Sequence, residues 1–152
     1  MAQLQQGFTD VLATGAGLRE TYYRALLAEA AGTRGESEAG QQLLAEAFAA
    51  MQRTEERYWE AELYRCQGEL FGQAAERRRQ EGTEANFLRA LEVARSQQAK
   101  SLELRAAMSL GRLWQKQGKR DDARTLLVPV YNWFTEGFDT ADLQEAKALL
   151  DA

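Results

Sequence analysis

Apolar residues recur at helical spacing along almost the whole chain, and no segment keeps the alternation of apolar and polar residues that marks a strand. Leu44, Ala47, Phe48 and Met51 stand at positions i, i+3, i+4 and i+7, which places them on one face of a helix. The chain also contains a single proline, so proline can interrupt a helix at one position only. These features predict an all-α fold.

Two kinds of marker residue recur along the chain at nearly constant spacing. A small residue within the first helix of each predicted pair recurs at separations of 40 and 43 residues: Ala28, Gly68 and Gly111. The residue that ends the apolar triplet of each second helix recurs at separations of 43 and 40 residues: Ala47, Ala90 and Val130. Two independent markers with the same period predict a helix hairpin that occurs three times.

The predicted organisation is a single repeat domain over residues 1–152, an α-α superhelix of antiparallel helix pairs with a C-terminal capping helix. We expect the three helix pairs at 18–52, 55–97 and 100–135, and the capping helix at 139–152. The apolar stripe in residues 1–14 predicts the second helix of a truncated repeat. We therefore expect the chain to be a fragment of a larger protein, with an open N-terminal end through which it self-associates.

Local signals place the boundaries of these helices. Thr83 and Ser101 are expected N-caps, and Asp139 or Thr140 is expected to open the last helix. The middle copy carries about three extra residues, which we assign to the connection around 75–82.

Glycine and proline mark special positions in the third copy. A glycine inside a helix costs about 0.5–1 kcal/mol relative to alanine, so Gly111 indicates a close crossing of two helices, with Ala123 on the other helix. Gly118 is expected to end the first helix in a left-handed conformation. Pro129 predicts a kink or break in the second helix.

Composition excludes several classes of function. The chain has 23 acidic and 19 basic residues and a net charge of −4, which argues against nucleic acid as a partner. No apolar run approaches the roughly 18 residues of a membrane span, so we expect no membrane association. The single cysteine, Cys66, suits a reducing compartment and a cytoplasmic location. Because histidine is absent, the commonest general base and metal ligand are missing, and we expect neither enzyme activity nor a cofactor.

The third copy resembles the tetratricopeptide repeat. Its residues Ala107-x2-Leu110-Gly111-x2-Trp114, followed by Gly118 and Ala123-x3-Leu127, are similar to the family pattern of large-x2-Leu-Gly-x2-aromatic followed by Ala-x3-aromatic. The period of 40 to 43 residues exceeds the roughly 34 of that family. The resemblance implies a stack of helix hairpins with a concave binding face.

A narrower resemblance covers roughly residues 20–150. The segments LRALEVARSQQAKSLELRAAMSLGRLWQKQG and PVYNWFTEGFDTADLQEAKALL are similar to the C-terminal helical-repeat region of large bacterial signalling regulators of the predicted-ATPase and adenylate/guanylate cyclase type. It implies a sensory or partner-binding role, with the catalytic modules outside these residues. The chain contains no phosphate-binding G-x4-G-K-[ST] loop.

Polar residues on the predicted first helices form the candidate site. They line up at helical spacing within each helix: Tyr22 and Glu29; Glu62, Arg65 and Glu69; Arg105, Arg112 and Lys116. One interpretation is a peptide-binding groove with a basic end that takes an acidic peptide or a carboxylate terminus. The other is a solvated face with ordinary intrahelical ion pairs.

Three functions remain open from the sequence. The favoured one is a non-catalytic scaffold that binds a peptide, a protein or another domain of its parent. A purely architectural or oligomerisation module is the alternative, and an autonomous enzyme is the least favoured. We further expect Trp133, Phe134 and Phe138 to form an apolar seal beneath the capping helix.

Overall fold

The computed structural model describes residues 20–72 and 77–151, together with residues 3, 6, 7 and 10. The two long stretches hold seven helices and no strand, which confirms the all-α prediction. The helices are α2 (Glu20–Thr33), α3 (Ser37–Thr54), α4 (Glu60–Gly72), α5 (Arg77–Ser96), α6 (Lys100–Lys116), α7 (Arg120–Tyr131) and α8 (Ala141–Asp151). The predicted helix of residues 1–14, and with it the predicted self-association face, falls almost wholly outside the described residues.

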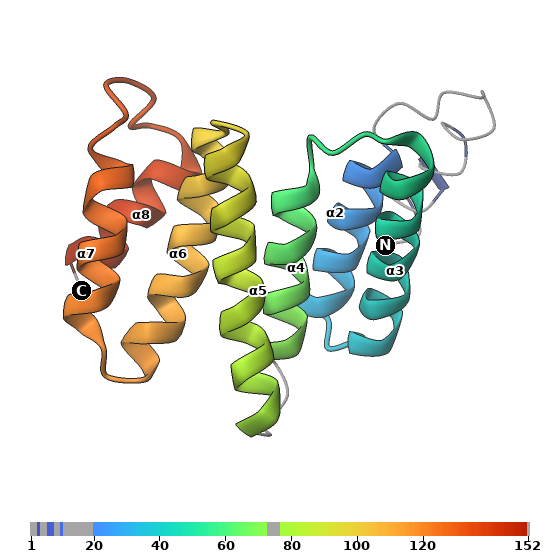
Figure 1. Ribbon diagram of the computed structural model, residues 1–152, viewed down its shortest axis with the longest axis horizontal. Coiled ribbons are helices and arrows are strands. Elements are labelled where there is room, and N and C mark those ends of the chain that lie inside the picture. The colour runs from blue at the N-terminus through green and yellow to red at the C-terminus, as the bar shows by residue number, and fades with distance from the viewer. Residues whose placement is uncertain (1–2, 4–5, 8–9, 11–19, 73–76, 152) are drawn as a thin grey trace.

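The helices follow one another along the long axis of the molecule in two layers (Figure 1). In one layer α2, α4, α6 and α8 each contact the next helix of that layer. In the other layer α3, α5 and α7 pack on the first-layer helices before and after them, and among the described residues they do not contact one another. The part of the chain that the structure describes is therefore an open stack rather than a bundle around one centre.

The apolar core is spread along this stack. One cluster joins α2, α3 and α4 around Leu44 and Leu63, and another joins α5 to α8 around Leu104, Leu110 and Leu127. All five side chains are almost fully buried. Each interface thus has its own share of the core, as expected when short helix pairs bury their faces against neighbours.

Left-handed residues end several helices, and one of them was expected. Gly118 has φ +81° and its amide donates to the Gln115 carbonyl at 3.0 Å, which confirms the prediction for this turn. Glu55 and Gln98 adopt φ +57° and +55° in the turns after α3 and α5. Since neither is glycine, nothing in the sequence marked these two positions.

The starts of α5 and α6 correct three expectations. Gly82 and Thr83 lie inside this helix, so Thr83 is not an N-cap, and most of the segment 75–82 lengthens α5 instead of the connection. The physical reason is packing: Thr83 is buried against Gly72 of α4, which stabilises a helical turn that Gly82 alone would weaken. Ser101 likewise lies one residue inside α6, which has no side-chain cap.

Two further expectations at the C-terminal end are corrected. The helix α7 continues through Pro129 to Tyr131, so of the expected kink or break the break does not occur. Trp133 and Phe138 are 57% and 46% exposed and form no seal, whereas Phe134 packs against the core. The reason is that α8 itself covers α6 and α7, through side chains that include the buried Leu143.

None of the helices in the described residues has the length and apolar character that crossing a membrane requires.

Candidate functional site

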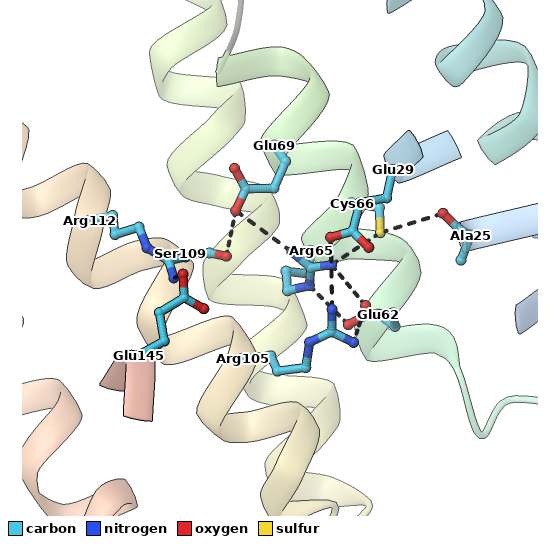
Figure 2. A network of polar contacts seen from close by, with 10 residues as sticks. All are labelled: Ala25, Glu29, Glu62, Arg65, Cys66, Glu69, Arg105, Ser109, Arg112 and Glu145. Atoms are coloured by element: carbon cyan, nitrogen blue, oxygen red, sulfur yellow. Dashed lines mark hydrogen bonds and ion pairs between the residues drawn. The ribbon is translucent and has the colours of Figure 1, made fainter. Parts of the chain in front are cut away.

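A buried arginine stands at the centre of the first layer. Arg65 of α4 is 5% exposed and forms a two-pronged interaction with Glu62, one helical turn earlier. Its Nε donates to Glu62 Oε2 at 2.9 Å and its Nη2 donates to Oε1 at 2.8 Å (Figure 2). This paired geometry is the strongest that a guanidinium and a carboxylate make.

Side chains from the two neighbouring helices complete the charge balance. Glu29 of α2 accepts a bond from Arg65 Nη2 at 2.6 Å, and Arg105 Nη1 of α6 lies 2.7 Å from Glu62 Oε1. Arg105 Nη2 also lies 3.8 Å from Glu29 Oε1. We call these four residues the ion network. It joins three first-layer helices, with two carboxylates against two guanidiniums.

Burial and pairing set the protonation of the groups here. Burial acts to lower the pKa of Arg65, but the hydrogen bonds to Glu62 together with the electrostatic attraction of Cys66, Glu62 and Glu29 outweigh it, so the pKa is raised and the charge is retained. Burial raises the pKa of the Cys66 thiol, although the nearby Arg65 acts to lower it. Cys66 is therefore a protonated thiol at neutral pH and not an activated nucleophile.

The polar face continues from α4 across α6 to α8. Ser109 Oγ donates to Glu69 Oε1 at 2.6 Å, and Arg65 Nη1 lies 3.7 Å from the same oxygen. Further along, Arg112 Nη2 lies 2.7 Å from Glu145 Oε1 (Figure 2). Unlike the ion network, the Arg112–Glu145 pair is open to solvent, with the Glu145 side chain 60% exposed.

Two adjoining hollows follow this face. One has a volume of about 240 Å³ and lies over the ion network, between Glu29 and Glu145. The other has a volume of about 260 Å³ and extends to Lys116, with Gly68 and Phe87 in its lining. Both are lined by Glu69, Ser109 and Arg112, so they adjoin at these residues, and we call the two hollows together the α6 groove.

The structure brings together most of the residues that the sequence singled out. Glu29, Glu62, Arg65 and Arg105 meet in the ion network, while Glu69 and Arg112 line the α6 groove. Lys116 lies at the far end of that groove and forms no ion pair within the described residues. Tyr22 lies elsewhere, with its ring stacked on Trp59 at 4.2 Å between centroids.

Two residues of the groove were missed. Ser109 lies four residues after Arg105 and three before Arg112, so the polar break it makes in an apolar run was a usable signal. Glu145 lies on α8, and nothing in the sequence indicated that it meets Arg112. Glu145 pairs with Arg112, so at the basic end of the groove Lys116 is the cation without an ion pair in the described residues, and Arg112 is a cation with an exposed partner.

Three possible metal ligands also lie together at the ion network. Ligand atoms of Glu29, Glu62 and Cys66 lie within 4.8 Å of one another. However, the guanidiniums of Arg65 and Arg105 already contact both carboxylates, and the thiol is protonated. A metal ion would have to displace two arginines, so this donor set does not fit one.

Comparison of the chain with protein-family models, with curated proteins and with solved structures finds no match in any of the three.

Proposed function

We propose that this chain is a non-catalytic protein-interaction scaffold, a tetratricopeptide-like superhelix that binds a peptide or partner domain in the α6 groove. The observation that carries the proposal is the pair of adjoining hollows beside α6, with Arg112 lining both and Lys116 lining the second. A groove that runs beside one helix and is lined by the neighbouring helices fits an extended peptide segment.

The charges divide the groove into a structural part and an available part. Glu62 and Arg65 are buried and bonded to each other. A ligand that displaced either side chain would leave the other as an unpaired buried charge. Arg112 is different, since its partner Glu145 is exposed, and a ligand carboxylate can replace Glu145 at little cost. Together with Lys116 it forms the recognition end for an acidic residue of the bound segment.

The same division supports an architectural contribution as a second function. The ion network joins α2, α4 and α6, although α2 and α6 do not pack directly on each other within the described residues. It therefore holds three repeats in one relative orientation, whether or not a partner is bound. Such a rigid stack suits the sensory or regulatory C-terminal part of a multidomain bacterial signalling protein in the cytoplasm.

The test is a capture experiment with two double variants. The purified chain is immobilised and exposed to a lysate of its source cell, and the retained proteins are identified. Three proteins are compared: wild type, the groove variant Arg112→Glu with Lys116→Glu, and the control variant Lys119→Glu with Lys147→Glu. Both pairs change the net charge equally, and the control residues lie outside the α6 groove.

We expect a retained protein that the groove variant loses and the control variant keeps. Retention that is equal in all three proteins, or no retention above bare resin, would remove the groove from the proposal and leave the architectural function.

A further inference from the structure

A third hollow, of about 430 Å³, lies between α5 and α7 with α6 as its floor. Four apolar side chains are part of its lining: Trp114, Leu126, Pro129 and Val130. The two wall helices run in the same direction and do not touch each other within the described residues (Figure 1). We call this feature the α5–α7 groove. It belongs to the opposite layer from the α6 groove and shares no lining residue with it.

The groove is long and narrow. Its lining on α6 reaches from Lys100 to Trp114, fourteen residues or about 20 Å along a helix. Its walls are helices whose backbone groups bond within themselves, so no free strand edge is available to an extended segment. A ligand helix, which needs only side-chain contacts, suits this surface better than a strand.

Exposed apolar side chains continue the groove along both walls. Among the described residues four large hydrophobic side chains are exposed, and two of them lie here. Leu88, 47% exposed, precedes Arg95 by seven residues and so lies on the same side of α5. Trp133, 57% exposed, follows Pro129 by four residues and lies against Lys100, with Nζ 5.8 Å from the ring centroid.

One end of the groove carries an excess positive charge. The carboxylate of Glu103 accepts a bond from Arg95 Nε at 2.8 Å on one oxygen and from Lys100 Nζ at 2.7 Å on the other. Neither cation has a second ion pair within the described residues, so two positive charges face one negative charge. The opposite end carries Asp122, which forms no ion pair in the described part of the chain.

We propose that the α5–α7 groove binds an amphipathic helix of a partner protein, whose apolar stripe is followed by an acidic residue at the Arg95–Lys100 end. The apolar stripe covers Leu88, Leu126 and Pro129, which otherwise stay in contact with water. The acidic residue neutralises the positive charge of Arg95 and Lys100 that Glu103 does not balance, and a basic residue at the other end of the helix pairs with Asp122. This site is independent of the α6 groove and adds a second binding face to the stack.

The probe is a display library of helix-forming peptides of about 14 residues, the length of the groove, with the apolar stripe and both ends randomised. The library is selected on the full chain, and the most enriched peptide is labelled for fluorescence polarisation. Its affinity is measured for wild type, Leu88→Glu, Arg95→Glu and the control Lys147→Glu. Circular dichroism of each variant checks that the helices are intact, and because Leu88 is 47% exposed its replacement should have little effect on folding.

We expect enriched peptides with apolar residues at i, i+4 and i+7 and an Asp or Glu at one end of the stripe. Affinity should fall at least tenfold in Leu88→Glu and in Arg95→Glu and stay unchanged in Lys147→Glu. A peptide whose acidic residue is replaced by Lys should recover binding to Arg95→Glu.

Four results would overturn the proposal. The first is no enrichment, and the second is binding that Leu88→Glu leaves intact. The third is a wild-type dimer that Leu88→Glu converts to a monomer in light scattering, since the occupant would then be a second copy. Loss of peptide binding in the Arg112→Glu, Lys116→Glu variant alone would place the selected peptide in the α6 groove, which also contradicts the second site.

Discussion

Gly68 and Gly111 hold equivalent places in two repeats, but an added methyl group should have opposite effects at the two positions. At Gly68 a Cβ would lie 2.5 Å from Cε1 and 2.7 Å from Cδ1 of Phe87, far inside van der Waals contact. At Gly111 the nearest atoms are Leu149 Cδ2 at 3.4 Å and Ala123 Cβ at 4.0 Å, which is ordinary contact. The ring of Phe87 is 3% exposed and belongs to the core cluster, so it has little room to move.

The magnitudes follow from two opposing effects. Replacing a helical glycine by alanine gains about 0.8–1.0 kcal/mol of helix propensity. Overpacking a filled core costs about 1–3 kcal/mol. Gly68→Ala should therefore lower the free energy of unfolding by about 0–2 kcal/mol, whereas Gly111→Ala should raise it by up to about 1 kcal/mol.

Urea denaturation followed by circular dichroism at 222 nm measures both variants against wild type, and each kcal/mol corresponds to about 2–4 °C in thermal midpoint for a chain of this size. A double-mutant cycle with Phe87→Leu identifies the cause, because the smaller side chain should recover stability only in the Gly68→Ala background. If Gly68→Ala stabilised the chain as much as Gly111→Ala does, the packing argument for the α4–α5 crossing would be refuted.

Three further predictions concern charge and burial. Arg65→Met should lower the free energy of unfolding by about 3–5 kcal/mol, because the carboxylates of Glu29 and the buried Glu62 are then opposed by Arg105 alone, while Arg34→Met at an exposed pair should change it by less than about 1 kcal/mol in the same urea titration. Burial acts to raise the pKa of Glu103, but hydrogen bonds from Lys100 and Arg95 hold it below its usual value. The contribution of Glu103 to stability is then present above its unfolded-state pKa and is lost as the pH falls through its folded-state pKa. Glu103→Gln should therefore flatten the decline of the thermal midpoint in acid. An unchanged decline would contradict this prediction. Since burial raises the pKa of Cys66, iodoacetamide at pH 8 should alkylate the native thiol far more slowly than the thiol of the urea-unfolded chain. Mass spectrometry measures the two rates, and equal rates would show that Cys66 is accessible in the native protein.

Local pattern carried most of the fold prediction, and its failures have a common cause. Periodicity identified the helices, and Gly118 marked a turn, because both depend on residues near in sequence. Gly82 and Thr83 were misread as the start of a helix. The structure shows that α5 begins earlier because this segment packs against α4, and that contact is not visible in the sequence. Trp133 was misread as a seal because α8, not the aromatic side chain, covers that end of the core.

The candidate site divides in the same way. Helical spacing correctly grouped Glu62, Arg65 and Glu69 on one side of α4, and Arg105 with Arg112 on α6. It did not show that Arg65 is buried or that α2 and α6 supply its remaining partners, because burial depends on helices 36 and 40 residues away in the chain.

By itself the amino-acid sequence determined the helical character of the chain and the sides of the helices on which charges stand. These properties arise from interactions within a few residues, which spacing records directly. The tertiary structure alone decided which charges are sealed into the ion network and which, such as Arg112 and Lys116, stay available on a groove. It also decided that Gly68 and Gly111, alike in the sequence, face different neighbours. The physical reason is that desolvation and close packing depend on which distant surfaces meet, and a side chain has no fixed burial until they do.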